Sequence, residues 1–278
     1  MNKKIKELIK KSSEGDVRSK ALLGFAYWSG QKIEQDFDLA MRLWKEVSKL
    51  NEPFGSFNVA TMYSRGDGVK QNYKKAHEFH EICISSKKKK YLACKVSSAK
   101  EFKRDSHFFL GQMFFLGNYK KDIKKGIYHY EKAFELGHFH ACYLLGFFHD
   151  KSVANFHGIK KNMNKAIKYY KLSAKFNYFP SFAKLCMIYG LGENVKKNLN
   201  LFNFYYKKAM SINNKIIETK LDIDDKQEQI NSIRLNLKKL AKTIRKNNQV
   251  CRSRKIIFLL SNGTNAQQNF LTKTHKII

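Results

Sequence analysis

One pattern of small and aromatic residues recurs five times along the sequence, and this repetition constrains the fold more than any other feature. In its clearest copy a small residue, Gly24, is followed three places later by Tyr27 and six places later by Gly30. The small residue or its substitute recurs at intervals of 36, 51, 35 and 40 residues, at Gly24, Ala60, Gly111, Gly146 and Cys186. Repeats of about 35 to 40 residues are typical of arrays built from helical hairpins.

A second pattern follows each copy of the first. It begins with Asp or Asn, and an aromatic residue or His comes eight places later. The first positions are Asp36, Asn72, Asp122, Asn162 and Asn198, and the later ones are Trp44, His80, Tyr130, Tyr170 and Tyr206. Because Asp and Asn side chains accept hydrogen bonds from the free amides at a helix start, we expect a second helix to begin after each of them.

Together the two patterns predict a pair of helices in each repeat. The small residue of the first helix lets a neighbouring helix approach closely, and the aromatic residue three places on fills the space beside it. A glycine such as Gly30, Gly66 or Gly117 then permits the turn between the two helices. Only two prolines occur in 278 residues, which also favours long helices over a turn-rich β-structure. We therefore expect about five helix pairs stacked into an α-solenoid, in which each unit contacts its neighbours.

The residues of the two patterns resemble a known family. The order A-x-x-x-L-G-x-x-Y-x-x-G, then G-V-x-x-[DN]-x-x-K-A, then an aromatic residue is similar to the Sel-one-like repeat, a relative of the tetratricopeptide repeat; the resemblance covers about residues 15–213. It implies an all-α, right-handed α/α superhelix of about five helix pairs with capping helices at its ends. It also implies an adaptor that binds a protein partner through a concave face, and it carries over no catalytic residue. Because His149, Cys186 and Phe202 depart from the pattern, we expect the last unit to pack irregularly.

The segments outside the repeats complete the expected domain organisation. We expect an N-terminal capping helix at 1–14, the solenoid at 15–214, a C-terminal helix at 215–250 and a basic, flexible tail at 251–278. A Lys-rich insertion at 84–105 interrupts the solenoid, and a solvated loop or an extra helical turn is expected there. The C-terminal helix carries apolar residues seven apart, such as Ile230, Leu237 and Ile244. A cap over the open end of the solenoid explains them best, and a coiled-coil dimer is the alternative.

The net charge of the chain is extreme. It has 54 Lys and Arg residues against 23 Asp and Glu, which gives a formal net charge of +31. Such a charge favours non-specific binding to polyanions. The excess consists almost entirely of lysine, which accompanies many Asn, Ile and Phe residues, so a bias toward AT-rich codons explains much of it equally well.

Two groups of basic residues are candidate binding sites for anions or for a partner. Lysines recur just before the second helix of a repeat, where the helix dipole and free amides already favour anions: Lys70, Lys120, Lys121, Lys160, Lys161, Lys196 and Lys197. Equivalent positions stack in a solenoid, so these side chains would follow one edge; a merely solvated edge is the alternative. The second group falls between residues 238 and 255: Lys238, Lys239, Lys242, Arg245, Lys246, Arg252 and Arg254, with Lys255 at its end.

No residue pattern points to catalysis. Ser97 and Ser181 each precede a lysine by three places, as in S-x-x-K, but the S-D-N and K-T-G motifs that belong with it are missing. His77, His80 and Cys83 are spaced like ligands on one helix face, yet His80 and Cys83 fall on packing positions of the repeat. We therefore expect no enzyme activity, no cofactor and no metal.

Cysteine usage and the ends of the chain bear on its location. Five irregularly spaced cysteines fit a reducing compartment. No apolar stretch is long enough for a transmembrane segment, and the first residues lack the features of a cleavable signal. The expected location is the cytoplasm, with effector-type export, which needs no cleavable signal, left open.

Two functions remain. The first is a non-enzymatic scaffold that binds a protein partner of unknown identity through the concave face of the solenoid. The alternative is an electrostatic, weak and non-specific binder of nucleic acid or anionic surfaces, which would use the connector lysines and the region 238–255. Salt separates them, because contacts to six to ten phosphates lose about 10³- to 10⁵-fold in affinity between 50 and 200 mM salt.

Overall fold

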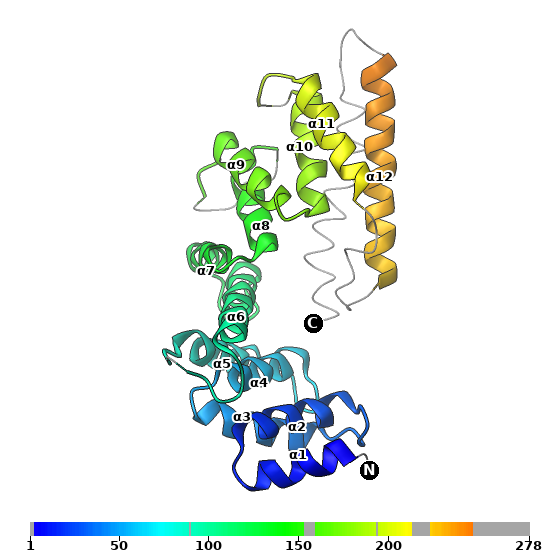
Figure 1. The fold of residues 1–278 in the computed structure, drawn as a ribbon. Helices are drawn as coiled ribbons and strands as arrows, with labels where there is room; N and C mark the ends of the chain where they lie inside the picture. The colour runs from blue at the N-terminus through cyan, green and yellow to red at the C-terminus, as the bar shows by residue number, and fades with distance from the viewer. Residues whose placement is uncertain (1–2, 89, 153–158, 193, 213–222, 247–278) are drawn as a thin grey trace. The chain divides into compact units, whose positions relative to one another are not determined.

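Helices account for all the regular structure that is described here. The computed structural model describes residues 3–88, 90–152, 159–192, 194–212 and 223–246, apart from the side chains at 96, 223–230 and 245–246 (Figure 1). Twelve α-helices, and no β-strand, occur in these ranges. The all-α prediction is therefore confirmed.

The chain divides into two compact units, residues 1–141 and residues 142–278. Unit 1 contains α1 (Lys3–Ser13), α2 (Val17–Ser29), α3 (Phe37–Lys49), α4 (Pro53–Arg65), α5 (Tyr73–Ser85), α6 (Val96–Leu116) and α7 (Ile123–Glu135). The division falls within α8 (Phe139–His149), and unit 2 continues with α9 (Met163–Ala174), α10 (Phe179–Leu191), α11 (Leu199–Ser211) and α12 (Ile223–Lys246). The domain boundaries expected from the sequence stay predictions.

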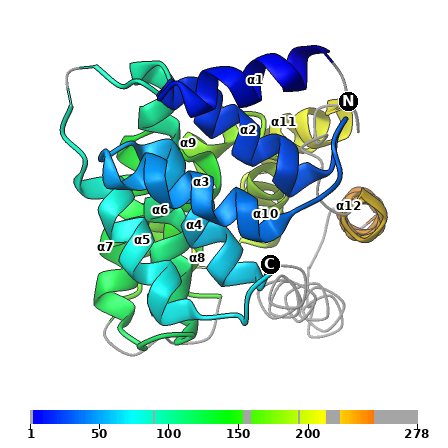
Figure 2. The same ribbon diagram turned by 90° about the horizontal axis from the view of Figure 1, so that it is seen from below.

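Each helix of unit 1 packs against the next one along the chain. Contacts run from α1 to α2 and onward to α7, and the first helices α4 and α6 also touch each other (Figures 1 and 2). In unit 2, α10 packs between α9 and α11. Packing of neighbours along the chain is the arrangement expected of a solenoid.

Side-chain caps start all five second helices, as the sequence predicted. In each case the Asp or Asn oxygen accepts a hydrogen bond of 2.8 to 3.0 Å from the backbone amide three residues on. The donors are the amides of Leu39, Lys75, Lys125, Lys165 and Leu201. Three of the first helices end, as predicted, at a glycine with positive φ, which measures 65° at Gly30, 85° at Gly66 and 80° at Gly117.

The small residue of the first helix is matched to the ring of the second. A Cβ atom on Gly24 would lie 2.6 Å from the indole of Trp44, and one on Gly111 would lie 2.8 Å from the ring of Tyr130. The repeat with an alanine at this position, Ala60, has the smaller imidazole of His80 instead. The volumes are complementary, because close-packed interiors leave no room for an added methyl group beside a full-sized ring.

The fifth repeat solves this packing problem differently. Its small position is Cys186, and Phe202 replaces the usual alanine. The buried ring is then Phe202 rather than Tyr206, and it lies one helical turn early, against Gly190, whose Cβ would be 2.9 Å away. The expected irregular packing of the last unit is confirmed, and its cause is this shift.

Helix α12 covers part of the last repeat. It contacts α10 and α11, with Leu237, Leu240 and Ile244 buried. The Arg234 guanidinium donates a hydrogen bond to the Ile212 carbonyl and lies 5.5 Å from the centre of the Phe179 ring. These contacts are those expected of a cap, while dimerisation through the same helix stays a prediction. Residues 215–222 and 247–278 lie outside the described ranges.

Candidate protein-binding surface

The most exposed apolar residues of the first helices lie on α2. Leu22 is 43% exposed and Phe25, one turn later, is 45% exposed. Trp28 continues this line with its side chain half-buried, and its ring centre lies 5.8 Å from that of Phe25. Helix α2 can turn this apolar line to solvent because its other side, with Ala21, Leu23 and Ala26, already contributes to the core.

The equivalent positions on α4 and α6 carry polar groups and one further ring. They are half-buried and occupied by Asn58, Thr61, Phe109 and Gln112. Together with Leu22 and Phe25 they are called the first-helix face of unit 1. This face offers apolar contact at one end and amide and hydroxyl groups further along, which suits the recognition of a polypeptide.

In unit 1, the connectors of the second and third repeats each contact a helix of the preceding repeat. The Trp28 indole N–H donates a 3.0 Å hydrogen bond to Asp67 of the next connector, and the ring centres of His77 and Tyr119 are 5.0 Å apart. Lys70, Lys120 and Lys121 are exposed on these connectors. The alignment of these lysines along one edge and anion binding there both stay predictions.

Lysines at the connectors of unit 2 differ from one another. Lys160, Lys196 and Lys197 are exposed, but the Lys161 ammonium nitrogen is enclosed. Burial lowers the pKa of Lys161, as does the nearby ammonium of Lys184, while the Asp150 carboxylate opposes the shift. Lys161 thus belongs to the interior of unit 2 as much as to its edge.

A second row of lysines was missed in the sequence. Lys75 and Lys125 occupy equivalent places in the first turn of α5 and α7, and both are exposed. The Lys75 ammonium lies 5.2 Å from the centre of the Tyr63 ring, and that of Lys125 lies 5.6 Å from the centre of the Phe114 ring. Cation–π attraction holds such side chains in place. The signal in the sequence was the lysine just before the small residue of the second helix.

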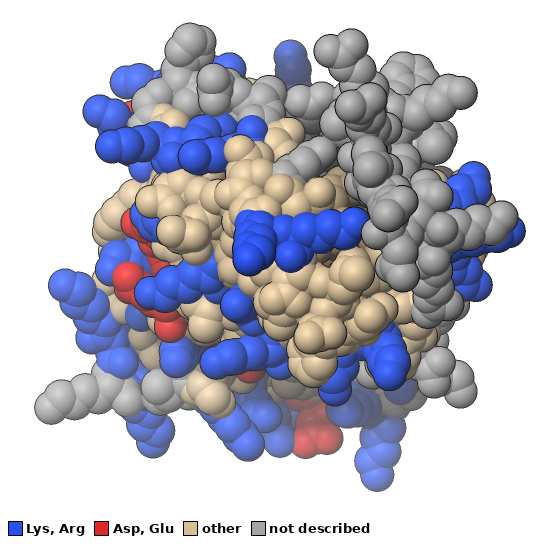
Figure 3. Space-filling view, turned by 90° about the horizontal axis from the view of Figure 1, so that it is seen from above, with Lys and Arg blue, Asp and Glu red and all other residues tan. Residues whose placement is uncertain are grey.

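The C-terminal basic group is only partly described. Lys238, Lys239 and Lys242 are exposed on α12. The side chains of Arg245 and Lys246, and the whole of Arg252, Arg254 and Lys255, lie outside the described part of the chain. On the face drawn in Figure 3, Lys and Arg side chains are spread between uncharged areas rather than gathered in one patch.

The two S-x-x-K sequences do not form a nucleophile pair. Ser97 and Lys100 are both exposed on α6. Lys184 is buried and lies 3.4 Å from the Asp150 carboxylate, which also accepts a 3.0 Å hydrogen bond from the Tyr170 hydroxyl. Burial raises the pKa of Asp150, but Lys184 and the hydrogen bonds from Ser152 and Tyr170 outweigh it, so that pKa lies below its usual value. Lys184 is therefore engaged in a structural ion pair.

The three residues spaced like metal ligands have separate surroundings. The ring of His80 is fully buried, hydrogen-bonds the Ser106 hydroxyl at 3.1 Å and stacks on Phe109. Burial lowers the pKa of His80 to about 3 and raises that of the Cys83 thiol to about 12. His80 thus takes the packing role that its place in the repeat predicts.

Comparison with known proteins decides the family. The model of the Sel1 repeat matches residues 17–51, 53–82, 104–138, 139–175 and 183–211. The chain belongs to the Sel1 repeat family. Sel1 repeat proteins generally act as scaffolds for protein–protein interaction. No curated protein sequence matches the chain.

The solved structure of one Sel1 repeat protein agrees with the fold. The chain is similar to a Sel1 repeat protein from Oxalobacter formigenes, with 19% identity, a TM-score of 0.61, and coverage of 76% of this chain and 81% of that one. Immunity protein Pa5087 from Pseudomonas aeruginosa gives 19% identity, a TM-score of 0.42, and coverage of 74% and 72%. Only the first of these likenesses supports the fold, and it supports the fold alone.

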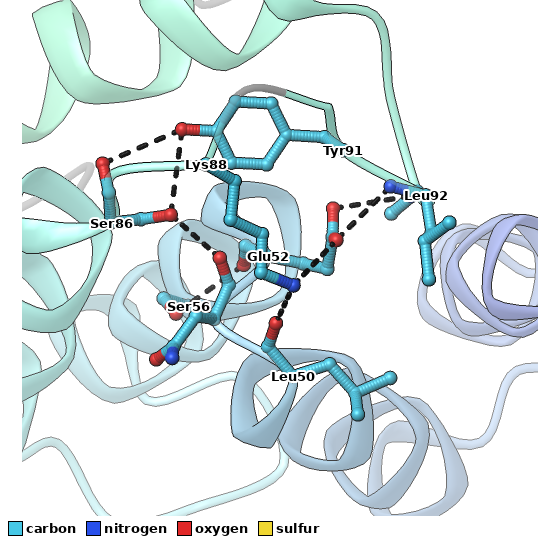
Figure 4. Close-up of polar contacts among 9 residues, drawn as sticks. Leu50, Glu52, Ser56, Ser86, Lys88, Tyr91 and Leu92 are labelled. Carbon is cyan, nitrogen blue, oxygen red and sulfur yellow. Dashed lines mark hydrogen bonds and ion pairs between the residues drawn. The ribbon is translucent and has the colours of Figure 1, made fainter.

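The Sel1 repeat matches leave residues 83–103 uncovered, and a buried polar cluster lies there. Glu52, at the start of α4, is completely buried, and its carboxylate holds Lys88, Leu92 and Ala93 of the insertion (Figure 4). The sequence predicted a solvated loop or an extra helical turn at this point. Nothing in the repeat pattern marks Glu52, because its partners are backbone amides 40 residues away.

None of the helices in the described ranges has the length and apolar character needed to cross a membrane.

Proposed function

We propose that this protein is a non-enzymatic scaffold that binds a protein partner through the first-helix face of unit 1. The supporting observation is the exposure of Leu22 and Phe25, one turn apart on α2 and continued by Trp28. Large contiguous apolar patches on a protein surface mark interaction sites. Aromatic anchors of this kind supply much of the affinity in protein interfaces.

The rest of the face gives the partner its orientation. Asn58 and Thr61 each donate a side-chain hydrogen bond to a carbonyl of their own helix, so their remaining capacity is open to a second bond. A polypeptide laid across α2, α4 and α6 would place apolar side chains on Leu22 and Phe25 and polar groups on Asn58 and Thr61. The face holds no titratable side chain, so it binds without acid–base chemistry.

Photo-crosslinking tests this proposal at single positions. A photoreactive phenylalanine analogue replaces Phe25 in one variant and Tyr128 in another, because Tyr128 is 52% exposed on the second helix α7. Illumination in matched cell lysate near physiological salt, after nuclease treatment, should give a discrete protein adduct at position 25 and none at position 128. Mass spectrometry identifies the adduct.

Two results would count against the scaffold proposal. Equal adducts at positions 25 and 128 would show that contact is non-specific. Adducts that nuclease removes, and that vanish steeply between 50 and 200 mM salt, would assign binding to charge instead.

A further inference from the structure

The insertion between α5 and α6 reaches back to the beginning of the repeat array. Its residues 90–95, called the strap, connect the second repeat to the third, yet they lie against helices of the first and second. Ala93 packs with Ala21 of α2 and Val47 of α3 in one apolar cluster, which Phe54 of α4 borders. The strap therefore covers a surface of the first and second repeats, although it connects the second repeat to the third.

Glu52 holds the strap by its backbone. One carboxylate oxygen accepts a 3.0 Å hydrogen bond from the Leu92 amide, and the other accepts a 3.2 Å hydrogen bond from the Ala93 amide (Figure 4). Glu52 stands at the N-cap position of α4 but makes no capping hydrogen bond, and Pro53 supplies a first residue that needs none. The carboxylate is thus left for the strap.

Side chains of the strap alternate between the protein and solvent. Tyr91 is 7% exposed, Leu92 is 55% exposed and Ala93 is 8% exposed. The backbone bends at residues 92–94, which brings two consecutive amides to the same carboxylate. The Tyr91 hydroxyl is tied to Ser86 at the other end of the insertion.

A lysine completes the contact from the residues before the strap. The Lys88 ammonium lies 3.3 Å from the Glu52 carboxylate and donates a hydrogen bond to the Leu50 carbonyl. The Ser86 hydroxyl donates a 2.7 Å hydrogen bond to the Asn51 carbonyl. The end of α3 and the start of α4 therefore offer one carboxylate and two carbonyl oxygens to a cation and to polar donors.

We propose that Glu52, with Ala21, Val47 and Phe54, forms a docking site for a segment of a partner protein that bends as the strap does, and that the strap occupies this site in the partner's absence. The partner's segment has the chemistry of the strap: two consecutive free amides, a small apolar side chain at the second of them, and a lysine a few residues earlier. A partner with this chemistry replaces the strap and leaves Glu52 paired.

Because the Glu52 carboxylate is buried, the partner's segment must replace the hydrogen bonds that the strap gives up. A buried carboxylate without partners is strongly unfavourable, so the strap leaves only when other donors arrive. Because the two decisive hydrogen bonds go to backbone amides, the site tolerates many side chains at the outward position of Leu92. Selectivity resides at Ala93, where a large or charged side chain meets the apolar cluster.

Binding of a synthetic peptide tests the proposal. The peptide has the sequence of residues 87–95 with Cys94→Ser, and it carries a fluorophore for anisotropy. It is titrated into the full-length chain and into a variant whose residues 87–95 are replaced by a Gly-Ser linker of equal length. We expect saturable binding to the linker variant and at least tenfold weaker binding to the unaltered chain, whose strap fills the site.

Matched peptides and protein variants locate the binding. Ala93→Arg in the peptide should weaken binding at least tenfold, whereas Leu92→Ser should change it less than about threefold. Glu52→Gln in the linker variant should weaken binding at least tenfold. Tyr128→Ser should leave it unchanged, because Tyr128 is exposed on α7, which does not line this site. The docking site is separate from the first-helix face and does not rest on the proposed function.

Several outcomes would overturn the proposal. These are no binding to a linker variant whose circular dichroism is native, equal binding of the Ala93→Arg peptide, or equal binding to the unaltered chain. If the linker variant does not fold, the full-length Ala93→Pro variant takes its place, because it removes one of the two amide donors and keeps the chain length. The same ranking of peptides is expected there, and its absence would refute the docking site.

Discussion

Equivalent positions on the first helices of the two units meet solvent very differently. In unit 1, Leu22 and Phe25 of α2 are 43% and 45% exposed. In unit 2, the residues at the same places on α8, Leu144 and Phe147, are each 3% exposed, and Lys184 of α10 is also 3% exposed. One repeat sequence thus supports an open face in unit 1 and a closed one in unit 2.

The difference separates what the repeat determines from what it leaves free. Caps, glycine turns and the match between small residues and rings recur in both units, because they hold each helix pair together. Exposure depends on what else packs on the pair. In unit 2, α12 lies against α10, and Asp150 draws Lys184 inward. We conclude that unit 1 leaves these first-helix positions open to solvent, whereas unit 2 buries them.

The largest expected effect is the loss of stability when the buried ion pair of unit 2 is broken. Asp150→Ala removes the carboxylate that faces the buried Lys184 ammonium at 3.4 Å. Breaking a buried ion pair from one side leaves an uncompensated charge, at a cost of about 3–5 kcal/mol. Urea unfolding of the full chain, together with hydrogen exchange of α9 and α10, measures this loss.

A double variant serves as the control for this ion pair. Adding Lys184→Met to Asp150→Ala replaces the pair by apolar groups, which is often close to neutral. Most of the lost stability should return. If Asp150→Ala alone changes nothing, the pair does not hold unit 2 closed.

Mild acid should lower the stability of unit 1, whereas Asp150→Ala lowers that of unit 2. The pKa of the buried His80 is lowered to about 3, and burial also lowers those of His107, His129 and His138. As the pH falls, these histidines therefore take up protons in the unfolded chain at a higher pH than in the folded chain. The free energy of unfolding falls as the pH drops below about 6.5. For His80 the fall amounts to about 2 kcal/mol between pH 7 and pH 5.

Replacing His80 tests this pH dependence. His80→Gln removes the titrating group without placing a full-sized ring beside Ala60, and it keeps a polar group near the Ser106 hydroxyl. Hydrogen exchange of α5 and α6 should then depend less on pH than in the unaltered chain, while exchange of α10 and α11 should behave alike in both. An unchanged pH response of α5 and α6 would contradict the linkage.

The helix pairs could be predicted because their determinants are local. A cap such as Asp36 and the Leu39 amide that donates to it lie three residues apart, and Gly24 and Trp44 belong to one repeat. The shift from Tyr206 to Phe202 was predictable only as an irregularity, since its cause is Gly190 of α10, one turn after the usual small position, where Cys186 stands.

The binding surfaces were less accessible to sequence analysis. The notion of a first-helix face followed from the repeat, but its exposure in one unit and burial in the other did not. The Glu52 site was missed entirely, because a carboxylate that binds backbone amides of Leu92 and Ala93 leaves no side-chain pattern. The connector lysines were visible, whereas the enclosure of Lys161 depends on Asp150.

A methyl group at the small position of the third repeat should be costly in unit 1. In Gly111→Ala the new Cβ lies 2.8 Å from Tyr130, whose ring is completely buried and has no space to move into. Overpacking of this kind costs about 1–3 kcal/mol. Gln112→Ala, on the neighbouring half-exposed residue, is the control and should stay within about 0.5 kcal/mol of the unaltered chain. Equal effects of the two changes in thermal unfolding would refute the match between glycine and ring.

The smallest expected effect is one that should be the same in both units. Asn72→Ala in unit 1 and Asn162→Ala in unit 2 each remove a capping bond to a lysine amide, of 2.9 and 3.0 Å. Loss of such a cap costs about 1 kcal/mol. Asn164→Ala, on an exposed residue inside α9, is the control and should not destabilise the chain. The caps lie within the helix pair, so the two losses of stability should be equal. Unequal losses at Asn72 and Asn162 would mean that the repeats of the two units themselves differ, and not only the elements that pack on them.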